Sequence, residues 1–264
     1  MLRLQRRKCP KILRTKGLAK TKELCALYDR SEPHRKGEER FSIDAETYGD
    51  LSVRKVLERA QRGKCGYCDA KMLPLDIEHY RPKSASKQAR TAKDEKPGYY
   101  WYWLSYEWQN LLLACVFCNQ SRQDTAGEPT GKGTLFPLIN PTKRARSHHD
   151  SLAPEEPLLL HPYEDDPDEH IGYRQYRLHA LTKKGEATIE VLKLCGKNQQ
   201  TQRKDHWKRI ETLLYRLFEF DGEVRPPKNQ QEIIEDLWAL AADDAEYAAM
   251  VRAALKEWGL PPAP

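Results

Sequence analysis

Two short segments, KCGYC at residues 64–68 and ACVFC at residues 114–118, decide the fold of this 264-residue chain. Each contains a C-x-x-C pair, and 46 residues separate the two pairs. A tight turn with this spacing aims two sulfurs at one metal ion, so two such pairs predict one tetrahedral zinc site. The predicted zinc ligands are Cys65, Cys68, Cys115 and Cys118. The alternative is four unrelated buried cysteines, and a closed four-thiolate site would be structural.

The composition, the N-terminus and the cysteine count indicate a soluble, cytoplasmic protein. Charged residues make up 32% of the chain, and no apolar run approaches the ~18 residues that a membrane span requires. The N-terminus lacks the apolar core and the cleavage site of a secretory signal. Seven cysteines without such a signal argue against a disulfide framework and for reduced thiols.

A basic arm opens the chain. Nine Lys and Arg residues precede Glu23, the first acidic residue, and the whole chain carries a net charge of +6. Such an arm attracts phosphates electrostatically. A solvated or partner-docking arm has the same composition, so the charge alone does not separate these alternatives.

The candidate catalytic residues are expected in the segment between the two cysteine pairs, because the predicted zinc site has no open coordination position. The pattern predicts a strand from Leu73 to His79 that ends in a turn at Pro82, so the stretch DIEHYRPK at 76–83 covers the strand end. After the second cysteine pair, the sequence NQSR at 119–122 is expected to begin a helix.

These elements together resemble the ββα-metal core of the HNH endonucleases in its zinc-stapled form. The resemblance rests on E-H-x-x-P at 78–82, W-x-N-L at 108–111 and C-x-x-C-N-x-x-R at 115–122, and it covers residues 64–122. It implies an α+β protein in which a ββα-metal core with a four-cysteine zinc site is flanked by a mainly helical C-terminal region.

The resemblance also implies a role for each matching residue. His79 matches the general base that takes a proton from the attacking water, and Glu78 matches the first carboxylate that binds the catalytic metal. Asn110 matches the Asn whose side chain ties the loop to the strand that bears the base. Asn119 matches the last letter of the motif and completes the metal site from the first turn of the helix.

General chemistry is consistent with these roles. Phosphodiester hydrolysis requires an activated water and a cation near the scissile phosphate, and a neutral imidazole accepts a proton at working pH. Oxygen ligands such as those of Glu78 and Asn119 favour Mg²⁺ or Mn²⁺ over zinc. Neighbouring strand residues point to opposite faces, so Glu78 and His79 reach one site only where the strand ends or bulges.

Several cations near the predicted site are candidates for contacts with nucleic acid. The candidates are Arg81, Lys83, Lys87 and Arg122, with Arg90, Lys93 and Lys96 in the loop that follows the strand. Arg122 stands where the HNH pattern often has Lys, and either residue neutralises phosphate. The alternative is an ordinary solvated charged face.

Two other segments have both a functional and a structural interpretation. The aromatic run at 99–108 could stack on unpaired bases, but its spacing favours packing around the core. The stretch at 158–173 contains two histidines and five acids. Its prolines favour a capped loop between strands over a second metal site.

The stretch at 158–173 and the helical segment after it also resemble a particular HNH lineage. This lineage comprises the nuclease subunits of Septu-type and retron-associated anti-phage systems, which are encoded beside an ABC/SMC-like ATPase. The resemblance implies cleavage of DNA under the control of such a partner. The alternatives are a zinc-binding scaffold or nucleic-acid-binding subunit without catalysis, and an RNase.

The pattern of charge, turns and apolar periodicity divides the chain into three regions. Residues 1–62 form a basic arm and a helix, and residues 63–126 form the nuclease core with its cysteine pairs. Residues 127–264 form an accessory region that is rich in loops up to about residue 182 and helical beyond it, with a possible role in partner docking.

Overall fold

The computed structural model describes residues 1–83, 86–89, 101–123, 127, 129–218 and 227–262. The helices are α1 (Leu18–Arg30), α2 (Glu32–Lys36), α3 (Ala45–Tyr48), α4 (Leu51–Gln61), α5 (Val116–Asn119), α6 (Lys183–Leu192), α7 (Lys197–Phe218), α8 (Pro227–Ala241) and α9 (Ala248–Glu257). The strands are β1 (Leu75–His79), β2 (Leu111–Cys115), β3 (Arg122–Gln123), β4 (Pro129–Thr130), β5 (Ile171–Arg174) and β6 (Arg177–Ala180).

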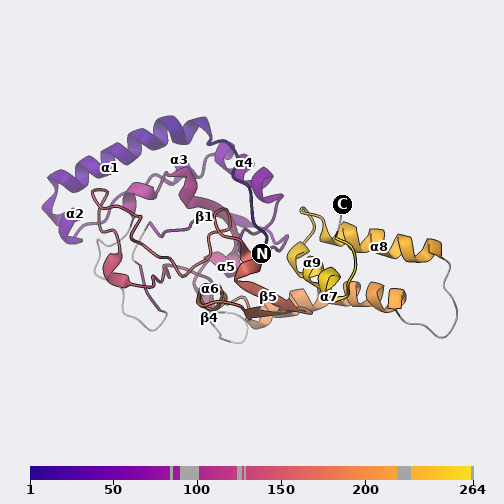
Figure 1. Ribbon diagram of the computed structural model, residues 1–264. Helices are drawn as coiled ribbons and strands as arrows, with labels where there is room; N and C mark the ends of the chain where they lie inside the picture. The colour runs from indigo at the N-terminus through magenta and orange to yellow at the C-terminus, as the bar shows by residue number, and fades with distance from the viewer. Residues whose placement is uncertain (84–85, 90–100, 124–126, 128, 219–226, 263–264) are drawn as a thin grey trace.

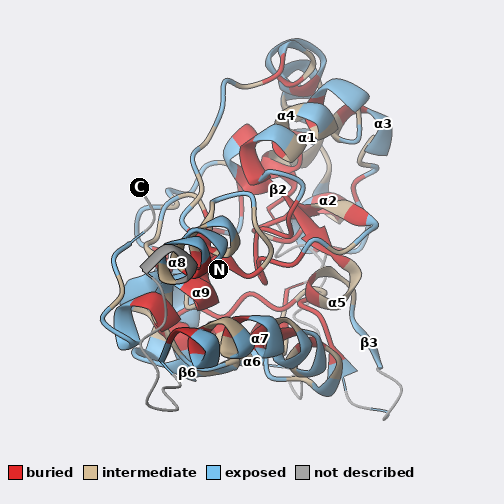
Figure 2. Cartoon of the chain, turned by 90° about the vertical axis from the view of Figure 1, so that its right-hand side faces the viewer, coloured by how far each residue is buried: buried red, intermediate tan, exposed pale blue. Residues whose placement is uncertain are grey.

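The fold mixes α and β structure, as the sequence predicts, with three two-stranded antiparallel sheets in the described ranges. Figure 1 shows α1 to α4 on one side of the molecule and α7 to α9 at the opposite end, with the N-terminus near their junction. Buried residues concentrate around β2, between the N-terminal helices and α7 (Figure 2). None of the described helices is both long and apolar enough to cross a membrane.

Helix α4 leads the chain into the first cysteine pair. The carboxylate of Asp50 accepts a hydrogen bond from the N–H of Ser52 and so caps the start of the helix. Val53 and Leu57 are buried one turn apart, as their spacing predicts. The helix ends at Gln61, and Gly63 has a φ of +69°, which a residue without Cβ adopts at low cost.

Strands β1 and β2 form the sheet that carries the predicted catalytic residues. Glu78 lies opposite Leu112 and His79 lies opposite Leu111 in a regular antiparallel register. Every residue of β2 is buried, so this strand forms the centre of the core. The side chain of Gln61 covers the free edge of β2, because its amide accepts from the N–H and donates to the carbonyl of Leu113.

Helix α5 differs from the prediction for residues 119–122. It spans a single turn and ends at Asn119, where a longer helix was expected to begin, and Arg122 lies in β3. The physical reason is competition for carbonyl groups. The N–H of Lys132 bonds the carbonyl of Cys118 at 2.7 Å, and the N–H of Gly133 bonds the carbonyl of Asn119 at 2.8 Å. A continuing helix would need those carbonyls for its own next turn.

The described part of the aromatic run packs into the core. Residues 101–108 form the 3-10 turns η2 (Tyr102–Leu104) and η3, which starts at Trp108. Trp101, Tyr102 and Trp108 are buried. This burial agrees with the packing interpretation, whereas residues 99 and 100 lie outside the described residues.

The stretch at 158–173 forms a loop that ends in β5, and it brings no metal cluster together among the described residues. Its two histidines have separate partners. His161 Nε2 bonds the backbone carbonyl of Gln109, and His170 Nδ1 bonds the hydroxyl of Thr182. The side chain of Asp166 caps the short turn η5 at Pro167–Glu169. The loop prediction is therefore confirmed for the part after Pro157, although an isolated bridge rather than a strand precedes it.

The C-terminal helices dock on the turn that carries the first cysteine pair. Lys64 and Asp69 form a buried ion pair of 2.6 Å, and Lys64 Nζ also donates to the carbonyl of Ala245. The backbone carbonyl of Asp69 accepts from the N–H of Tyr247, and its carboxylate accepts from the N–H of Ala249. These contacts join α9 directly to the predicted zinc turn.

Candidate functional site

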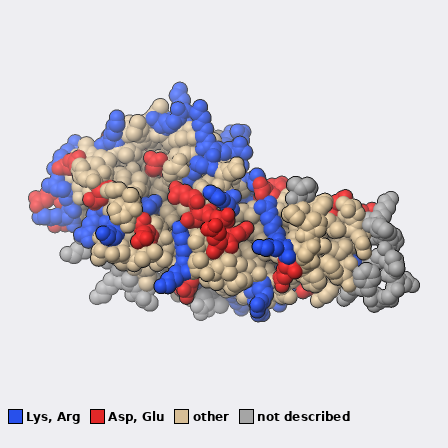
Figure 3. Space-filling view, viewed as in Figure 1, with Lys and Arg blue, Asp and Glu red and all other residues tan. Residues whose placement is uncertain are grey.

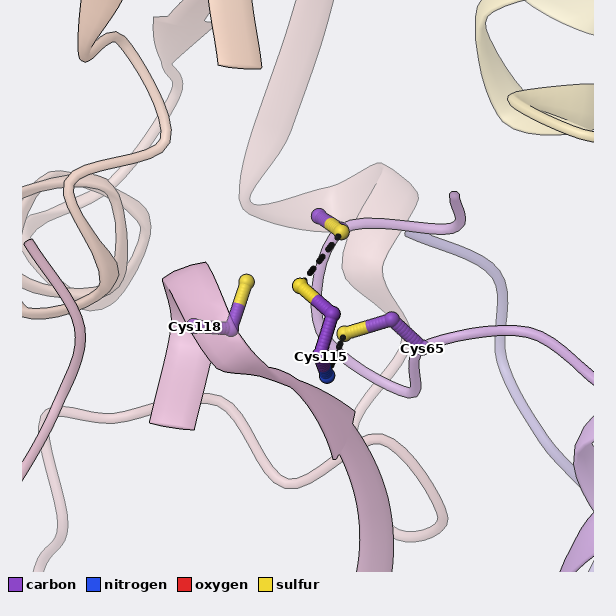
Figure 4. Close-up of side chains that lie close together, drawn as sticks. Cys65, Cys115 and Cys118 are labelled. Atoms are coloured by element: carbon purple, nitrogen blue, oxygen red, sulfur yellow. Dashed lines mark hydrogen bonds between the residues drawn. The ribbon is translucent and has the colours of Figure 1, made fainter. Parts of the chain in front are cut away.

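The four predicted zinc ligands come together in the core. The Sγ atoms of Cys65, Cys68, Cys115 and Cys118 lie within 4.8 Å of one another, and all four residues are buried. Figure 4 shows Cys115 at the end of β2, Cys118 on the helix that follows and Cys65 on the facing loop. Sulfurs at ~2.3 Å from one tetrahedral zinc are roughly 3.8 Å apart. The distance of 3.7 Å between the Sγ atoms of Cys68 and Cys115 fits that edge, so this cluster could bind zinc.

Neighbouring groups support thiolates in this cluster. The N–H of Cys115 donates to Cys65 Sγ at 3.3 Å, and the side-chain amide of Gln199 on α7 donates to Cys118 Sγ at 3.3 Å. Hydrogen bonds from N–H groups stabilise sulfur ligands and fix their orientation. A Cβ on Gly66 would lie 3.1 Å from the side chain of Leu112 on β2, so a residue without Cβ suits this close approach.

His79 is buried at the end of β1, with 3% of its surface exposed. Its Nε2 lies 2.9 Å from the backbone carbonyl of Ser105, and because a carbonyl only accepts, Nε2 carries the proton. This tautomer leaves the lone pair on Nδ1, which lies 3.4 Å from Lys83 Nζ. The ring of Tyr48 packs edge-on against the imidazole at 4.7 Å between centroids.

Burial lowers the pKa of His79 to about 3, and the ammonium group of Lys83 acts in the same direction. The imidazole is therefore neutral near pH 7 and able to accept a proton at Nδ1. A phosphate placed beside Nδ1 would raise this pKa toward neutrality, because a nearby negative charge favours the protonated form.

Asn110 ties together the two segments around the imidazole. Its Oδ1 accepts from the N–H of Arg81 at 2.7 Å, and its Nδ2 donates to the carbonyls of Arg81 at 3.0 Å and Leu104 at 3.1 Å. Arg81 follows His79 by two residues, and Leu104 precedes the Ser105 carbonyl that holds Nε2. One buried amide thus fixes both the chain just after His79 and the segment whose carbonyl sets the tautomer of its imidazole.

We expect Asn110→Ala to lower the free energy of unfolding by about 2–4 kcal/mol, because it leaves buried backbone groups without partners. It should also lower any cleavage rate, since the Ser105 carbonyl loses its support. Urea denaturation followed by circular dichroism measures the first effect. The matched control is Gln109→Ala, because that neighbouring side chain is exposed. Equal stability of the Asn110 variant and the wild type would show that these bonds do not hold the loop.

Glu78 lies on the opposite face of β1 and pairs with a buried lysine. Its Oε1 lies 2.6 Å from Lys132 Nζ, and the Lys132 side chain is fully buried. Lys132 Nζ also donates to the backbone carbonyl of His79 at 3.0 Å. The ammonium group therefore neutralises the carboxylate and holds the strand end at the same time.

Asn119 lies near a second carboxylate on the same face. Its Nδ2 is 3.4 Å from Asp76 Oδ2, and the side-chain amide of Gln120 donates to the same oxygen at 2.8 Å. Asp76 and Glu78 are two residues apart on β1, so both carboxylates project from one face of the strand. Oxygen atoms of this kind suit Mg²⁺ or Mn²⁺.

The predicted site residues therefore fall into two groups. His79 and Asn110 share one network through the backbone of residues 104–105 and 81, whereas Glu78 and Asn119 contact Lys132 and Asp76 respectively. The strand pairs regularly up to His79 and shows no bulge in its register. The two groups thus flank the end of β1 from opposite faces.

We expect Lys132→Met to lower the free energy of unfolding by about 3–5 kcal/mol, because it leaves the Glu78 carboxylate buried without its counter-ion. Adding Glu78→Gln to that variant should restore part of the loss, since the unpaired charge is then removed. A double-mutant cycle by urea denaturation measures the coupling. Additive effects of the two substitutions would contradict a buried ion pair.

The predicted contacts with nucleic acid occupy different environments. Arg81 Nε donates to the buried carboxylate of Glu155 at 2.8 Å, so this side chain has a structural role. Lys83 lies beside His79 Nδ1, Lys87 is half-buried, and Arg122 is exposed on β3. Arg90, Lys93 and Lys96 lie outside the described residues.

The basic arm is partly engaged within the chain. Arg6 donates to the backbone carbonyls of Leu111 and Gln109, and its guanidinium stacks on the Tyr163 ring at 3.6 Å from the centroid. Burial lowers the pKa of Arg6 to about 10. In Figure 3, Lys and Arg side chains lie along the upper rim of the face shown, over α1 and α4, while Asp and Glu gather near its middle.

Three groups at the candidate site were not predicted from the sequence. They are Asp76, Lys132 and the backbone carbonyl of Ser105. The alternation of acids in D-I-E at 76–78 was a usable signal for Asp76, because a strand places positions i and i+2 on one face. No local pattern marks the other two, since both reach the site through tertiary packing.

Comparison with known proteins gives matches to Septu proteins, while no protein-family model matches the sequence. The chain is 36% identical to Septu protein PtuB of Bacillus mycoides strain KBAB4 over 172 residues, which is 63% of this chain and 54% of that protein. It is 27% identical to Septu protein PtuB of Bacillus thuringiensis over 151 residues, which is 56% of this chain and 42% of that protein. It is also 27% identical to Septu protein PtuA of the same Bacillus mycoides strain over 209 residues, which is 78% of this chain and 27% of that protein.

The chain thus spans about half the length of the PtuB proteins it matches and about a quarter of the PtuA protein. The similarity to Septu proteins agrees with the lineage expected from the sequence. It also shows that a segment similar to most of this chain occurs within a much longer protein.

Proposed function

We propose that this chain is a divalent-cation-dependent endonuclease that hydrolyses DNA, and that it acts as the nuclease of a Septu-type anti-phage complex with an ATPase partner. The observation that carries the proposal is the imidazole of His79. Its Nε2 proton is held by a backbone carbonyl, and its lone pair is left on Nδ1 at the end of β1. This is the arrangement that a general base requires.

In the proposed reaction, Nδ1 of His79 takes a proton from a water molecule that attacks the phosphorus. Asn110 and the Ser105 carbonyl keep the ring in the productive tautomer throughout. Lys83, beside Nδ1, attracts the phosphate and orients it toward the water. By resemblance to HNH enzymes, the products carry 5′-phosphate and 3′-hydroxyl ends.

The oxygen donors on the other face of β1 fit a hard divalent cation. Glu78 and Asn119 would hold it, with Asp76 as an additional neighbour. The cation would offset negative charge that develops on the leaving oxygen. Glu78 and His79 project from opposite faces of β1, so both reach one phosphate only if it binds at the end of the strand, beyond His79.

The described state is closed, which supports control by a partner. His79 is 3% exposed and Glu78 is neutralised by Lys132. Substrate binding must therefore expose the imidazole of His79 and separate Lys132 from the carboxylate of Glu78. The contacts between α9 and the first cysteine turn give the C-terminal helices a direct connection to the core. We propose that an ABC/SMC-like ATPase docks on this helical region and governs the opening.

The test incubates the purified chain, alone and with its co-expressed ATPase partner, with supercoiled plasmid and with labelled RNA. We expect cleavage of DNA in Mg²⁺ or Mn²⁺, no cleavage after chelation by EDTA, and 5′-phosphate ends. Cleavage of RNA with intact DNA would indicate an RNase. Binding without cleavage under every condition, including with the partner, would support the non-catalytic scaffold and overturn the proposal.

A further inference from the structure

A second cluster of metal-binding side chains lies where the end of α1 meets the loop after Ser147. Among the described residues, Asp29, His148 and His149 are the one group besides the four cysteines whose ligand atoms all lie within 4.8 Å of one another. His149 Nε2 is 2.7 Å from Asp29 Oδ1, and His148 Nε2 is 3.5 Å from Asp29 Oδ2. Neither the sequence motifs nor the proposed reaction uses these side chains.

The spacing fits one metal ion. Ligand atoms at ~2.1 Å from a shared zinc lie roughly 3.0–3.4 Å apart, depending on the coordination geometry. The two measured distances bracket that range, so small side-chain rotations suffice. The imidazole rings of the two histidines are 4.0 Å apart between centroids, and the Nε2 atom of each lies within 3.5 Å of a carboxylate oxygen of Asp29.

Neighbouring groups prepare His148 as a ligand. The hydroxyl of Tyr102 lies 2.7 Å from His148 Nδ1, and Tyr28 packs edge-on against the same ring. When Nδ1 donates its proton to that hydroxyl, the lone pair is on Nε2, which faces Asp29.

The position of Asp29 is unfavourable without a nearby positive charge. The residue lies in the last turn of α1, where the negative end of the helix dipole disfavours a carboxylate. Arg35 is close, but its guanidinium bonds the backbone carbonyls of Tyr28 and Asp29. A cation between the carboxylate and the two imidazoles offsets this cost.

We propose that Asp29, His148 and His149 form a metal site separate from the four-cysteine cluster and from the proposed cation site at Glu78, specific for a first-row transition cation and chiefly for Zn²⁺. Two imidazoles and one carboxylate suit zinc, whereas Mg²⁺ and Ca²⁺ prefer oxygen atoms throughout. Three protein ligands leave at least one coordination position for water. The site joins two segments that are far apart in the chain, because Asp29 and His148 are separated by 119 positions.

The metal clamps α1 onto the loop that supports His79. Tyr28 of α1 stacks on Tyr102 of η2 at 5.4 Å, and Tyr102 bonds His148. The same turn, η2, ends at Leu104, whose carbonyl is held by Asn110. Metal binding therefore stabilises the loop next to the proposed base. The binding site itself does not depend on the nuclease proposal.

The test counts zinc in the full-length chain before and after titration with Zn²⁺, and it measures binding by calorimetry. We expect the wild type to bind one zinc ion beyond the four-cysteine site. His149→Ala and Asp29→Asn should weaken that binding at least about 10-fold, because ligands and their supports are worth 10–100-fold in metal affinity. Both side chains are largely exposed, so the fold tolerates these changes. The matched control is His179→Ala, an exposed histidine on β6, which should bind like the wild type.

Cobalt distinguishes the two sites by their ligands. The additional Co²⁺ should give weak absorption bands without thiolate-to-metal charge transfer, and the wild type alone should gain thermal stability from it. Thiolate charge transfer from the additional ion would place it on cysteines and overturn the proposal. A wild type that binds no additional Zn²⁺ at 100 µM free metal, or a His149→Ala variant that binds it equally well, would overturn it too.

Discussion

His79→Ala is expected to lower the rate of DNA cleavage by about 10²–10⁴-fold, which is the usual contribution of a general base. The substitution removes the Nδ1 atom that accepts the proton of the attacking water. It leaves Lys83, Glu78 and Asn119 in place, so DNA should bind with nearly unchanged affinity. Single-turnover cleavage in saturating Mg²⁺ measures the effect on the chemical step.

Two controls separate a lost base from a disturbed fold. His34→Ala removes another buried histidine, on α2, and should cleave DNA like the wild type. Added imidazole should restore part of the activity of His79→Ala by filling the cavity with a free base. An undiminished rate for His79→Ala would show that another group activates the water.

Cys68→Ser is expected to abolish stoichiometric zinc binding at the four-cysteine cluster and to unfold the surrounding core. Structural zinc in small domains contributes about 10–16 kcal/mol of folding free energy, whereas a whole domain is stable by only about 5–15 kcal/mol. The buried cluster joins the first cysteine turn to β2 and α5, so its loss separates these elements. Metal analysis and thermal denaturation measure the two effects.

The matched control is Cys195→Ser, because this thiol is exposed and lies outside the cluster. It should retain zinc and show the melting temperature of the wild type. A Cys68→Ser variant with full zinc content and unchanged melting would refute the assignment of these ligands.

Local signals predict the parts of this fold that depend on local sequence. The C-x-x-C spacing brings four sulfurs together, and the apolar period places Val53 and Leu57 on the buried face of α4. The strand before Pro82 was expected to start at Leu73 and starts at Leu75. These features follow from turn geometry, helical periodicity and strand alternation, which a single segment determines.

The remaining features depend on contacts between distant segments. Helix α5 stops at Asn119 because Lys132 and Gly133 take its carbonyl groups, and nothing at residues 119–122 signals that competition. Lys132 also supplies the ammonium group that pairs with the carboxylate of Glu78. The role of Ser105 is that of a backbone carbonyl, so its side-chain identity carries no information about it.

The most direct test of the central claim locates the catalytic cation. Crystals of the His79→Ala variant with a DNA duplex and Mn²⁺ would trap the uncleaved substrate, and anomalous scattering would locate the metal. We predict a Mn²⁺ peak within about 2.2 Å of oxygen atoms of Glu78, Asn119 and the scissile phosphate, with Lys132 displaced from the carboxylate. A peak elsewhere, or none with Lys132 still paired to Glu78, would contradict a catalytic site at the end of β1.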